Sequence, residues 1–338
     1  MAEALVLEPK DFASDQEVRW CPGCGDYSIL KAVHRALADA GSDPANTVFV
    51  SGIGCSSRLP YYVNTYGFHT IHGRAPAIAT GVKLANPELD VWVITGDGDG
   101  LSIGGNHLLH ALRRNVNLNI LLFNNEIYGL TKGQYSPTSR VGTRSPTSPS
   151  GSFDQPVVPG VFAVGAGATF IARAVDIDQK GLPTLLNAGR EHEGTAFIEI
   201  LQNCIVYNED IWESVSSKKT AADSHVVCVH GQPLLFGKDR KKGLRLNTQS
   251  LTLEAVVIGE AGVTENDIKV HDETSTTLAH LLLSMQAPLP MAMGILHRRQ
   301  GEAFDTTYRK RKPEGRRQRV KALLRSNNVL DRRPAANS

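Results

Sequence analysis

Four short, uniformly apolar segments constrain what this chain of 338 residues can fold into. Each has the length and composition of a buried strand, and they lie at residues 47–51, 91–95, 119–123 and 196–201. Helical patterns separate them, and these lie at residues 28–40, within 69–85, and at 105–114, 168–174 and 183–191. Strands that are apolar throughout and alternate with helices are typical of a parallel sheet covered on both faces. We therefore predict an α/β fold with a mostly parallel sheet.

Residues that can bind ligands directly follow these strands. They comprise a glycine-rich turn at 52–55, a turn of alternating Gly and Asp at 96–100, the pair Asn124-Asn125, and Cys204. The carboxyl ends of parallel strands meet at one edge of a sheet, and ligands bind there. We therefore expect these residues to share one site. Residues 136–159 are dense in Ser, Thr, Pro and Gly and predict a long loop.

The charge of the chain is uneven, although its formal net charge is only +2. Residues 298–333 contain 13 Lys and Arg against 4 Asp and Glu, which predicts a solvated basic extension at 298–338. Docking of this extension onto an acidic partner is the alternative. We expect a core domain at 1–210 and a C-terminal lobe or arm, packing on the core or on a partner, at 211–297. Residues 271–283 have the pattern of a helix within that lobe.

The composition also bears on partners and location. With a net charge near zero, we expect no nucleic-acid partner. No apolar run is long enough to span a membrane, and residues 1–10 lack the features of a secretory signal. The expected location is the cytoplasm, where disulfides are improbable.

Because disulfides are improbable, we expect the five cysteines to have roles other than disulfide formation. Cys21-Pro-Gly-Cys24 contains a turn that points both sulfurs to one side, and Cys55 and Cys204 each follow a predicted strand. Four converging thiolates suit a [4Fe–4S] cluster or a structural zinc ion, and the pair alone is also compatible with a redox dithiol. Single cysteines scattered around one pair favour the cluster. Cys228 lies outside the pattern and is expected to be a buried structural thiol.

A second pattern indicates a diphosphate bound through magnesium. Asp97, flanked by Gly96 and Gly98, follows one strand, and Asn125 follows the next. Their side-chain oxygens, with the backbone carbonyl of Ile127, are hard ligands of the kind that Mg²⁺ requires. We expect a helix starting near Ser102 to offer its N-terminus to the anion. The combination is the signature of a thiamine-diphosphate site. Residues 165–170 match the fingerprint of a dinucleotide-binding site only in part, and we interpret them as a close approach of a helix.

These residues occur within longer motifs that resemble a known family. The motifs are Trp20-Cys-Pro-Gly-Cys-Gly25, Ser51-Gly-Ile-Gly-Cys-Ser-Ser57, Ile71-His-Gly-Arg-Ala75, Gly96-Asp-Gly-Asp99 and Asn124-Asn-Glu-Ile-Tyr-Gly-Leu-Thr-Lys-Gly-Gln134. Together they are similar to the β subunit of 2-oxoacid:ferredoxin oxidoreductases, especially the 2-oxoglutarate type. The match spans roughly residues 11–210 and implies the thiamine-diphosphate-binding fold. The basic extension departs from the shorter family members.

The resemblance implies particular roles for individual residues. It implies a [4Fe–4S] cluster on Cys21, Cys24, Cys55 and Cys204, and magnesium on Asp97, Asn125 and the Ile127 carbonyl. It implies that the cofactor is surrounded by Gly54, Cys55, Ser56, His72, Gly73, Gly96, Asp97, Gly98, Asp99, Asn125, Ile127, Tyr128, Gly129 and Leu130. His72 is also a catalytic candidate. Arg58 and Lys132 are candidates for binding the distal carboxylate of the substrate, because a guanidinium or an ammonium can pair with it.

The activity implied by the resemblance is the oxidative decarboxylation of 2-oxoglutarate with coenzyme A. The products are succinyl-CoA and carbon dioxide, electrons pass through the cluster to ferredoxin, and the reaction is reversible in principle. The implied partner is an α subunit that supplies much of the substrate pocket, in an (αβ)₂ assembly, so the chain alone is expected to be inactive. Pyruvate, or a broad range of 2-oxoacids, is the alternative substrate. A zinc-bound interaction protein without catalysis is the alternative of another class.

Overall fold

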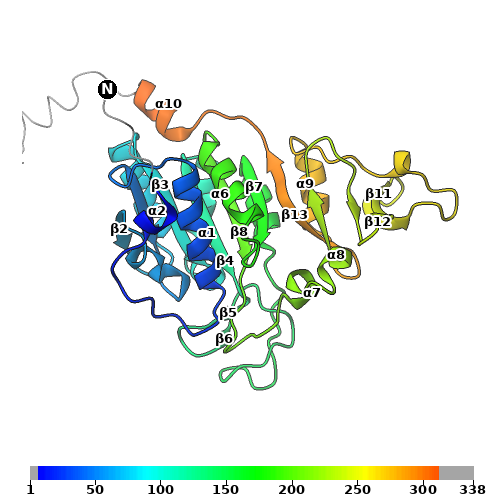
Figure 1. Ribbon diagram of the computed structural model, residues 1–338, viewed down its shortest axis with the longest axis horizontal. Helices are drawn as coiled ribbons and strands as arrows, with labels where there is room; N and C mark the ends of the chain where they lie inside the picture. The colour runs from blue at the N-terminus through cyan, green and yellow to red at the C-terminus, as the bar shows by residue number, and fades with distance from the viewer. Residues whose placement is uncertain (1–6, 312–338) are drawn as a thin grey trace, which may run out of the picture.

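The computed structural model describes residues 7–311, and at its centre is an eight-stranded sheet (Figure 1). The strand order is β2-β1-β3-β4-β8-β7-β13-β9. In chain order the strands are β1 (Thr47–Ser51), β2 (Tyr66–His69), β3 (Asp90–Gly96), β4 (Leu118–Asn124), β7 (Phe170–Val175), β8 (Thr195–Leu201), β9 (His225–Cys228) and β13 (Met291–Arg298). Neighbouring strands run parallel except β13, which is antiparallel to β7. The predicted mostly parallel sheet is confirmed.

Helices cover both faces of the sheet. One face packs against α1 (Asp26–Asp39) and α6 (Gly181–Glu191), which lie side by side in Figure 1. The other packs against α2 (Ala75–Ala85), α4 (Gly105–Arg114), α5 (Pro159–Gly165) and α9 (Thr276–Leu283). Alternation along β3 supplies both cores, because Val93 faces the α2 side and Trp92 and Ile94 face the α1 side. Trp92 also stacks on Phe49 of β1, with ring centroids 5.7 Å apart.

The segment at 168–174 is not the predicted helix, because strand β7 (Phe170–Val175) occupies most of it. Alanines at 168, 172 and 174 favour a helix intrinsically, which explains the wrong prediction. Gly167, with φ of +82°, ends the preceding turn after α5, and the chain then enters β7 between β8 and β13. Ala172 is completely buried there, where small side chains fit between two packed layers. The 165–170 motif is therefore a turn from a helix into a strand.

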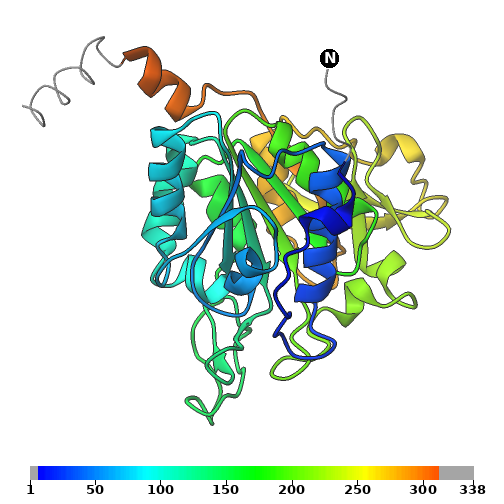
Figure 2. The ribbon, with the colours of Figure 1, turned by 60° about the vertical axis from the view of Figure 1, so that its left-hand side comes forward.

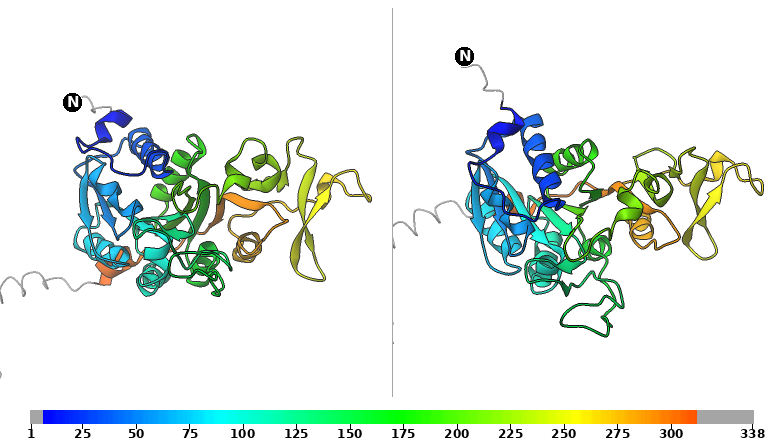
Figure 3. Two further views of the ribbon diagram at one scale, coloured as in Figure 1. Left: turned by 90° about the horizontal axis from the view of Figure 1, so that it is seen from below. Right: turned by 60° about the horizontal axis from the view of Figure 1, so that its bottom comes forward.

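The segment beyond residue 210 contributes to the main sheet through β9 and β13. It also forms a second, antiparallel sheet of β10 (Leu235–Phe236), β11 (Lys242–Asn247) and β12 (Thr252–Val257), which projects away from the core (Figure 3). Short helices α7 (Glu213–Ser216), α8 (Ala221–Ser224) and η3 (Glu265–Asp267) connect these parts. The expected helix at 271–283 begins later, at Thr276, because the side chain of Ser275 caps it by accepting from the N–H of Leu278. The domain boundaries remain predictions.

The basic extension begins within the described residues. Helix α10 (Phe304–Arg311) returns to the core, where Asp305 accepts a hydrogen bond of 2.9 Å from the backbone N–H of Asn117. Arg309 of this helix pairs with Glu88 at 3.0 Å. The rest of the predicted extension lies outside the described residues. None of the helices between residues 7 and 311 has both the length and the apolar character that crossing a membrane demands.

Residues 136–158 form the predicted long loop, which extends from the carboxyl edge of the sheet (Figure 2). It follows the small hairpin of β5 (Ile127–Tyr128) and β6 (Gln134–Tyr135). The hairpin and the loop therefore start where β4 ends, beside the carboxyl ends of β3 and β8. Of two short 3₁₀ helices, η1 (Pro9–Phe12) packs against α1, and η2 (Ser56–Tyr61) follows the turn after β1 at this edge.

Candidate active site

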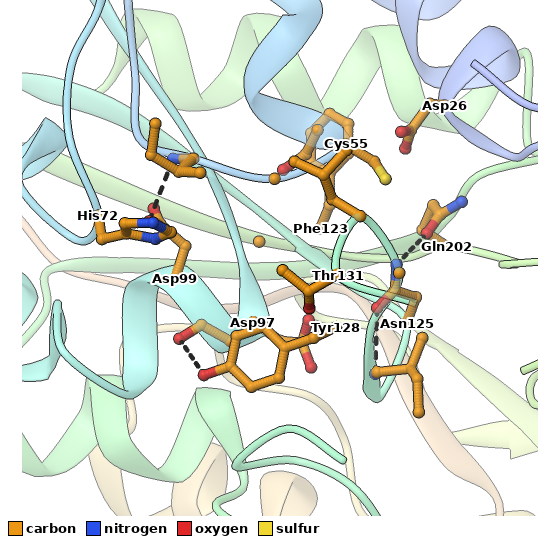
Figure 4. A pocket seen from close by; sticks show the side chains of 18 of the residues that line it. Asp26, Cys55, His72, Asp97, Asp99, Phe123, Asn125, Tyr128, Thr131 and Gln202 are labelled. Carbon is orange, nitrogen blue, oxygen red and sulfur yellow. Dashed lines mark hydrogen bonds between the residues drawn. The ribbon is translucent and has the colours of Figure 1, made fainter. Parts of the chain in front are cut away.

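A cleft of about 660 Å³ lies at the carboxyl ends of four adjacent strands, β1, β3, β4 and β8. Residues directly after each strand line it, as the sequence predicted, and Figure 4 shows their side chains pointing into one space. All the residues expected to surround the cofactor line this cleft apart from Gly73. Gly73 is buried beneath it, and its N–H donates to Asp99 at 2.7 Å. The site therefore assembles from segments that are far apart in the sequence.

Asp97 is a buried carboxylate at the floor of the cleft. The hydroxyls of Ser136 and Thr138 both donate to its Oδ2, each at 2.5 Å. Burial raises the pKa of Asp97 to about 6, although these hydroxyl hydrogen bonds oppose the shift. Hydrogen bonds from the backbone at Gly98 and Asp97 oppose it too, and the carboxylate lines the cleft, as a metal ligand would need. A Cβ at Gly98 would lie 2.2 Å from the Tyr128 ring, so glycine is required for this close approach.

Asn125 lies opposite Asp97 at the end of β4. Its Oδ1 accepts the N–H of Ile127 at 3.1 Å, and its Nδ2 donates to Gln202 Oε1 at 2.7 Å. These contacts fix the orientation of the carboxamide and leave a lone pair of Oδ1 for a cation. Asp97, Asn125 and Ile127 thus present hard oxygen atoms to one cleft, and this donor set fits a magnesium-held diphosphate.

Asp99 connects two turns through hydrogen bonds to its carboxylate. Its Oδ1 accepts from the N–H groups of Ile53 and Gly73, and its Oδ2 accepts from the Thr95 hydroxyl at 2.6 Å. The carboxylate therefore holds the turn after β1 against the turn before α2. The expected helix near Ser102 differs in position, because α3 (Asp97–Leu101) begins at Asp97 itself and α4 begins at Gly105.

The four predicted cluster cysteines lie near one another, and Cys55 among them lines the cleft. A Cβ at Gly129 would lie 3.5 Å from Cys204 Sγ and 3.7 Å from Cys55 Sγ, so both sulfurs face the same point. Cys24 Sγ accepts a hydrogen bond of 3.2 Å from Gln202, two residues before Cys204. Cys21 is exposed and lies one turn before Cys24, whose N–H donates to the Cys21 carbonyl at 3.0 Å. Cys228 is buried elsewhere, in β9.

The electrostatics of the thiols bear on metal binding. Burial, with the nearby Asp26 carboxylate, raises the pKa of Cys24, and the same causes raise that of Cys55 to about 12. Cys204 contributes to the rise in both cases, which also reflects how close these sulfurs lie. Such thiols stay protonated until a metal displaces the protons. Within residues 7–311, no three His, Cys, Asp or Glu side chains are placed to hold a single metal ion.

The sequence analysis did not predict several polar residues of the site. They include Asp26, Ser136, Thr138 and Gln202. Asp26 is 1% exposed, and burial, with the nearby Asp176 carboxylate, raises its pKa to about 7 although a hydrogen bond with Cys24 opposes the shift. Gln202 directly follows an apolar strand, so its position offered the same signal that identified Asn125. Ser136 and Thr138 lie in a loop rich in Ser and Thr, so no pattern distinguishes them from their neighbours.

The two candidates for substrate recognition do not line the cleft. Arg58 is partly buried and its Nε donates to the Tyr62 hydroxyl at 3.0 Å. Its charge lowers the pKa of Cys55 against the larger effect of burial, which places it near the cysteines. Lys132 is exposed on the turn between β5 and β6, with φ of +76°. His72 does line the cleft and is exposed.

Comparison with known proteins defines the class. Residues 52–200 match the family model described as "Thiamine pyrophosphate enzyme, C-terminal TPP binding domain". The matched range contains most of the cleft, including Asp97, Asn125 and the turn after β1. The fold and this match together define a thiamine-diphosphate-binding domain.

Relatives over a longer range define the family. The 2-oxoglutarate oxidoreductase subunit KorB of Mycobacterium tuberculosis is 54% identical over 263 residues, which cover 75% of this chain and 70% of that protein. The β subunit of 2-oxoacid:ferredoxin oxidoreductase 1 from Aeropyrum pernix is 50% identical over 190 residues, covering 56% and 60%. The chain belongs to the β subunits of the 2-oxoacid:ferredoxin oxidoreductases, and the resemblance indicated by the motifs is confirmed. Members of this family are parts of multi-subunit oxidoreductases.

A solved structure resembles the whole described fold. It is the 2-oxoglutarate:ferredoxin oxidoreductase from Magnetococcus marinus with 2-oxoglutarate, coenzyme A and succinyl-CoA bound. The TM-score is 0.72 at 34% sequence identity, and the alignment covers 94% of this chain and 96% of that chain. The likeness therefore extends beyond residue 210, where the sequence motifs end.

Proposed function

We propose that this chain is the β subunit of a 2-oxoglutarate:ferredoxin oxidoreductase that forms succinyl-CoA and carbon dioxide and passes two electrons, one at a time, to ferredoxin. The observation that carries the proposal is that Cys55 lines the same cleft as Asp97 and Asn125, while Cys204 lies close to Cys55 and Cys24 contacts Gln202 of the lining. A cofactor that accepts one electron at a time would therefore lie next to the place where the 2-oxoacid is decarboxylated. The relatives named for 2-oxoglutarate support the choice of substrate.

In this proposal the chain's own residues hold two groups. Asp97, Asn125 and the Ile127 carbonyl would bind Mg²⁺ and through it the diphosphate, while Cys21, Cys24, Cys55 and Cys204 would ligate a [4Fe–4S] cluster. When bound, thiamine diphosphate supplies the carbanion and electron sink for decarboxylation, and the cluster supplies one-electron transfer. Ser136 and Thr138 hold the Asp97 carboxylate in place, and Asp99 keeps the turns around the cleft together.

The reaction also needs surfaces that this chain does not supply. The cleft is open, and large apolar side chains such as Ile71, Ile103 and Leu130 are exposed, the last two on its lining. Burying such side chains is favourable when a partner covers them. We propose that an α subunit covers the cleft, excludes water and completes the substrate and coenzyme A sites in an (αβ)₂ assembly.

The experiment is anaerobic purification of the chain with its α subunit, followed by metal analysis of cysteine variants. We expect iron and acid-labile sulfide in the wild type, and loss of both in Cys204→Ser and Cys55→Ser. Cys228→Ala, which changes a thiol far from the cleft, is the matched control and should retain the iron.

Two alternatives give different results. Bound zinc without iron or sulfide would instead support a zinc-bound interaction protein without catalysis. In a substrate panel with a ferredoxin acceptor, turnover of pyruvate as fast as that of 2-oxoglutarate would support a broad-specificity or pyruvate enzyme.

A further inference from the structure

We infer that Gln202 is a positioning residue that links the magnesium side of the cleft to the cysteine cluster. The inference rests on the proposed function, because it assigns a role toward two groups that the proposal places in this cleft. Gln202 follows β8 directly and is 1% exposed. Its backbone N–H donates to the carbonyl of Asn124 at 2.9 Å, which fixes the residue between the ends of β4 and β8.

The side chain of Gln202 makes three contacts, and they use its whole carboxamide. Oε1 accepts from Asn125 Nδ2 at 2.7 Å. Nε2 donates to the carbonyl of Asn203 at 2.7 Å and to Cys24 Sγ at 3.2 Å. One amide group therefore contacts a proposed magnesium ligand on one side and a proposed cluster ligand on the other. Figure 4 shows the first of these contacts, between Gln202 and Asn125.

The orientation of this amide is fixed from both ends. The Asn203 carbonyl can only accept a hydrogen bond, so the nitrogen of Gln202 must face it. Asn125 accepts the Ile127 N–H with its oxygen, so its nitrogen must face the oxygen of Gln202. Turning the Asn125 amide over would break two hydrogen bonds, and turning the Gln202 amide over would break three. An unsatisfied polar group in a buried site costs more than the bond itself is worth.

Each contact has a physical consequence. The N–H of Gln202 that faces Cys24 would stabilise the more negative, reduced form of the cluster, because hydrogen bonds to ligating sulfur raise the reduction potential. The oxygen of Gln202 holds the Asn125 amide, and thereby directs Asn125 Oδ1 toward the metal. Gln202 thus sets both how readily the cluster accepts an electron and how firmly the diphosphate is held.

Two substitutions separate these effects in the complex with the α subunit. Gln202→Met keeps the length of the side chain but removes all three contacts, including those with Asn125 and Cys24. Gln202→Glu keeps an oxygen for Asn125 and removes the N–H that faces Cys24. Gln179→Met is the matched control, because Gln179 donates to the carbonyls of Ser28 and Asp176 and contacts neither site.

The measurements are the midpoint potential of the cluster, followed by EPR in a redox titration, and the calorimetric affinity for thiamine diphosphate with Mg²⁺. We expect Gln202→Met to have a more negative potential and about fivefold weaker binding, the ratio expected for one net hydrogen bond. Gln202→Glu should have a potential at least as negative, with binding close to that of the wild type. The control should match the wild type in both.

An unchanged potential or an unchanged affinity in Gln202→Met would overturn the inference, because the linking role needs both contacts. If Gln202→Met does not fold, an unchanged potential in Gln202→Glu would overturn it. A wild-type complex without a cluster, or without affinity for thiamine diphosphate, would refute the proposed function itself. A wild-type complex with both, beside variants that do not differ from it, would refute only the role of Gln202.

Discussion

At the scale of single residues, Arg58 is the side chain with which the choice of 2-oxoacid can be tested. Its Nε is held by the Tyr62 hydroxyl, so the guanidinium has a defined direction. If it pairs with the distal carboxylate, Arg58→Ala should raise the KM for 2-oxoglutarate at least tenfold, the effect of losing a charge-assisted hydrogen bond of about 1.5–3 kcal/mol. The KM for pyruvate, which lacks that carboxylate, should change little.

Steady-state kinetics of the complex with both substrates check this expectation. Arg35→Ala is the control, since Arg35 is exposed on α1 and pairs with Asp39 alone among the contacts of its side chain that the structure describes. Equal increases in both KM values would remove Arg58 from substrate recognition and leave Lys132 as the candidate.

His192 predicts how stability depends on pH. Its ring contacts the Thr169 hydroxyl at 2.8 Å, and burial, with the charges of Arg298 and His297, lowers its pKa to about 4. Between about pH 6.5 and pH 4 the unfolded chain binds a proton at this site and the folded chain does not. The contribution of His192 is therefore fully present above about pH 6.5 and decreases as the pH falls through this window.

Urea denaturation at pH 7 and pH 5 measures the effect. The loss of unfolding free energy between the two pH values should be smaller in His192→Gln than in the wild type. It should be unchanged in His280→Gln, because His280 is exposed on α9. An identical loss in His192→Gln and the wild type would contradict the expected role of His192.

Individual site residues were predictable where the chemistry follows directly from residue type and position. Asp97 and Asn125 were found because each follows an apolar strand, and Cys55 and Cys204 were singled out because each is an isolated cysteine after a predicted strand. Ser136 and Thr138 were not found, because a hydroxyl in a loop rich in hydroxyls has no local signal. Their role depends on how the loop returns to the floor of the cleft, and the sequence does not encode that in any short pattern.

At the scale of elements, the loop at residues 136–158 is hydrogen-bonded to the site. Thr138 donates to Asp97 Oδ2 at 2.5 Å and contacts Asn124 Oδ1 at 3.1 Å. Thr138→Val preserves the shape of the side chain and removes these hydrogen bonds, together with the contact of the hydroxyl with Ser136 at 3.1 Å. We expect binding of thiamine diphosphate with Mg²⁺ to weaken about fivefold or more, since one to two net hydrogen bonds are lost. We also expect trypsin to cleave the loop faster, after Arg140 or Arg144.

Calorimetry and limited proteolysis of the complex test this prediction. Thr147→Val is the matched control in the same loop, because its hydroxyl contacts only Ser145 among the described residues. Wild-type affinity together with a wild-type cleavage rate in Thr138→Val would show that the loop does not support the site.

Element prediction failed where tertiary burial outweighs intrinsic preference. The alanine-rich segment of β7 favours a helix in isolation, yet the space between β8 and β13 selects an extended strand. Strands β9 and β13 were also missed, since their apolar residues are interrupted and their neighbours are distant in sequence. The strands that position the site are buried on both faces and were predicted for that reason.

At the scale of the whole molecule, the open cleft implies that the chain works as part of a complex. The large apolar side chains of Ile71, Ile103 and Leu130 are exposed on or near the cleft. All four residues of β2 are exposed as well. The isolated chain should therefore show no turnover of 2-oxoglutarate, and adding the α subunit should restore it. Ferredoxin reduction by the chain alone would contradict this division of the active site.

The central claim is that an iron–sulfur cluster on four cysteines lies beside thiamine diphosphate and takes electrons from 2-oxoglutarate. The most direct test is the visible absorbance and EPR spectrum of the anaerobic complex before and after 2-oxoglutarate and coenzyme A are added without ferredoxin. We predict a broad visible absorbance that bleaches, together with the EPR signal of a reduced cluster. A colourless complex, or an absorbance and an EPR spectrum that 2-oxoglutarate leaves unchanged, would contradict the claim.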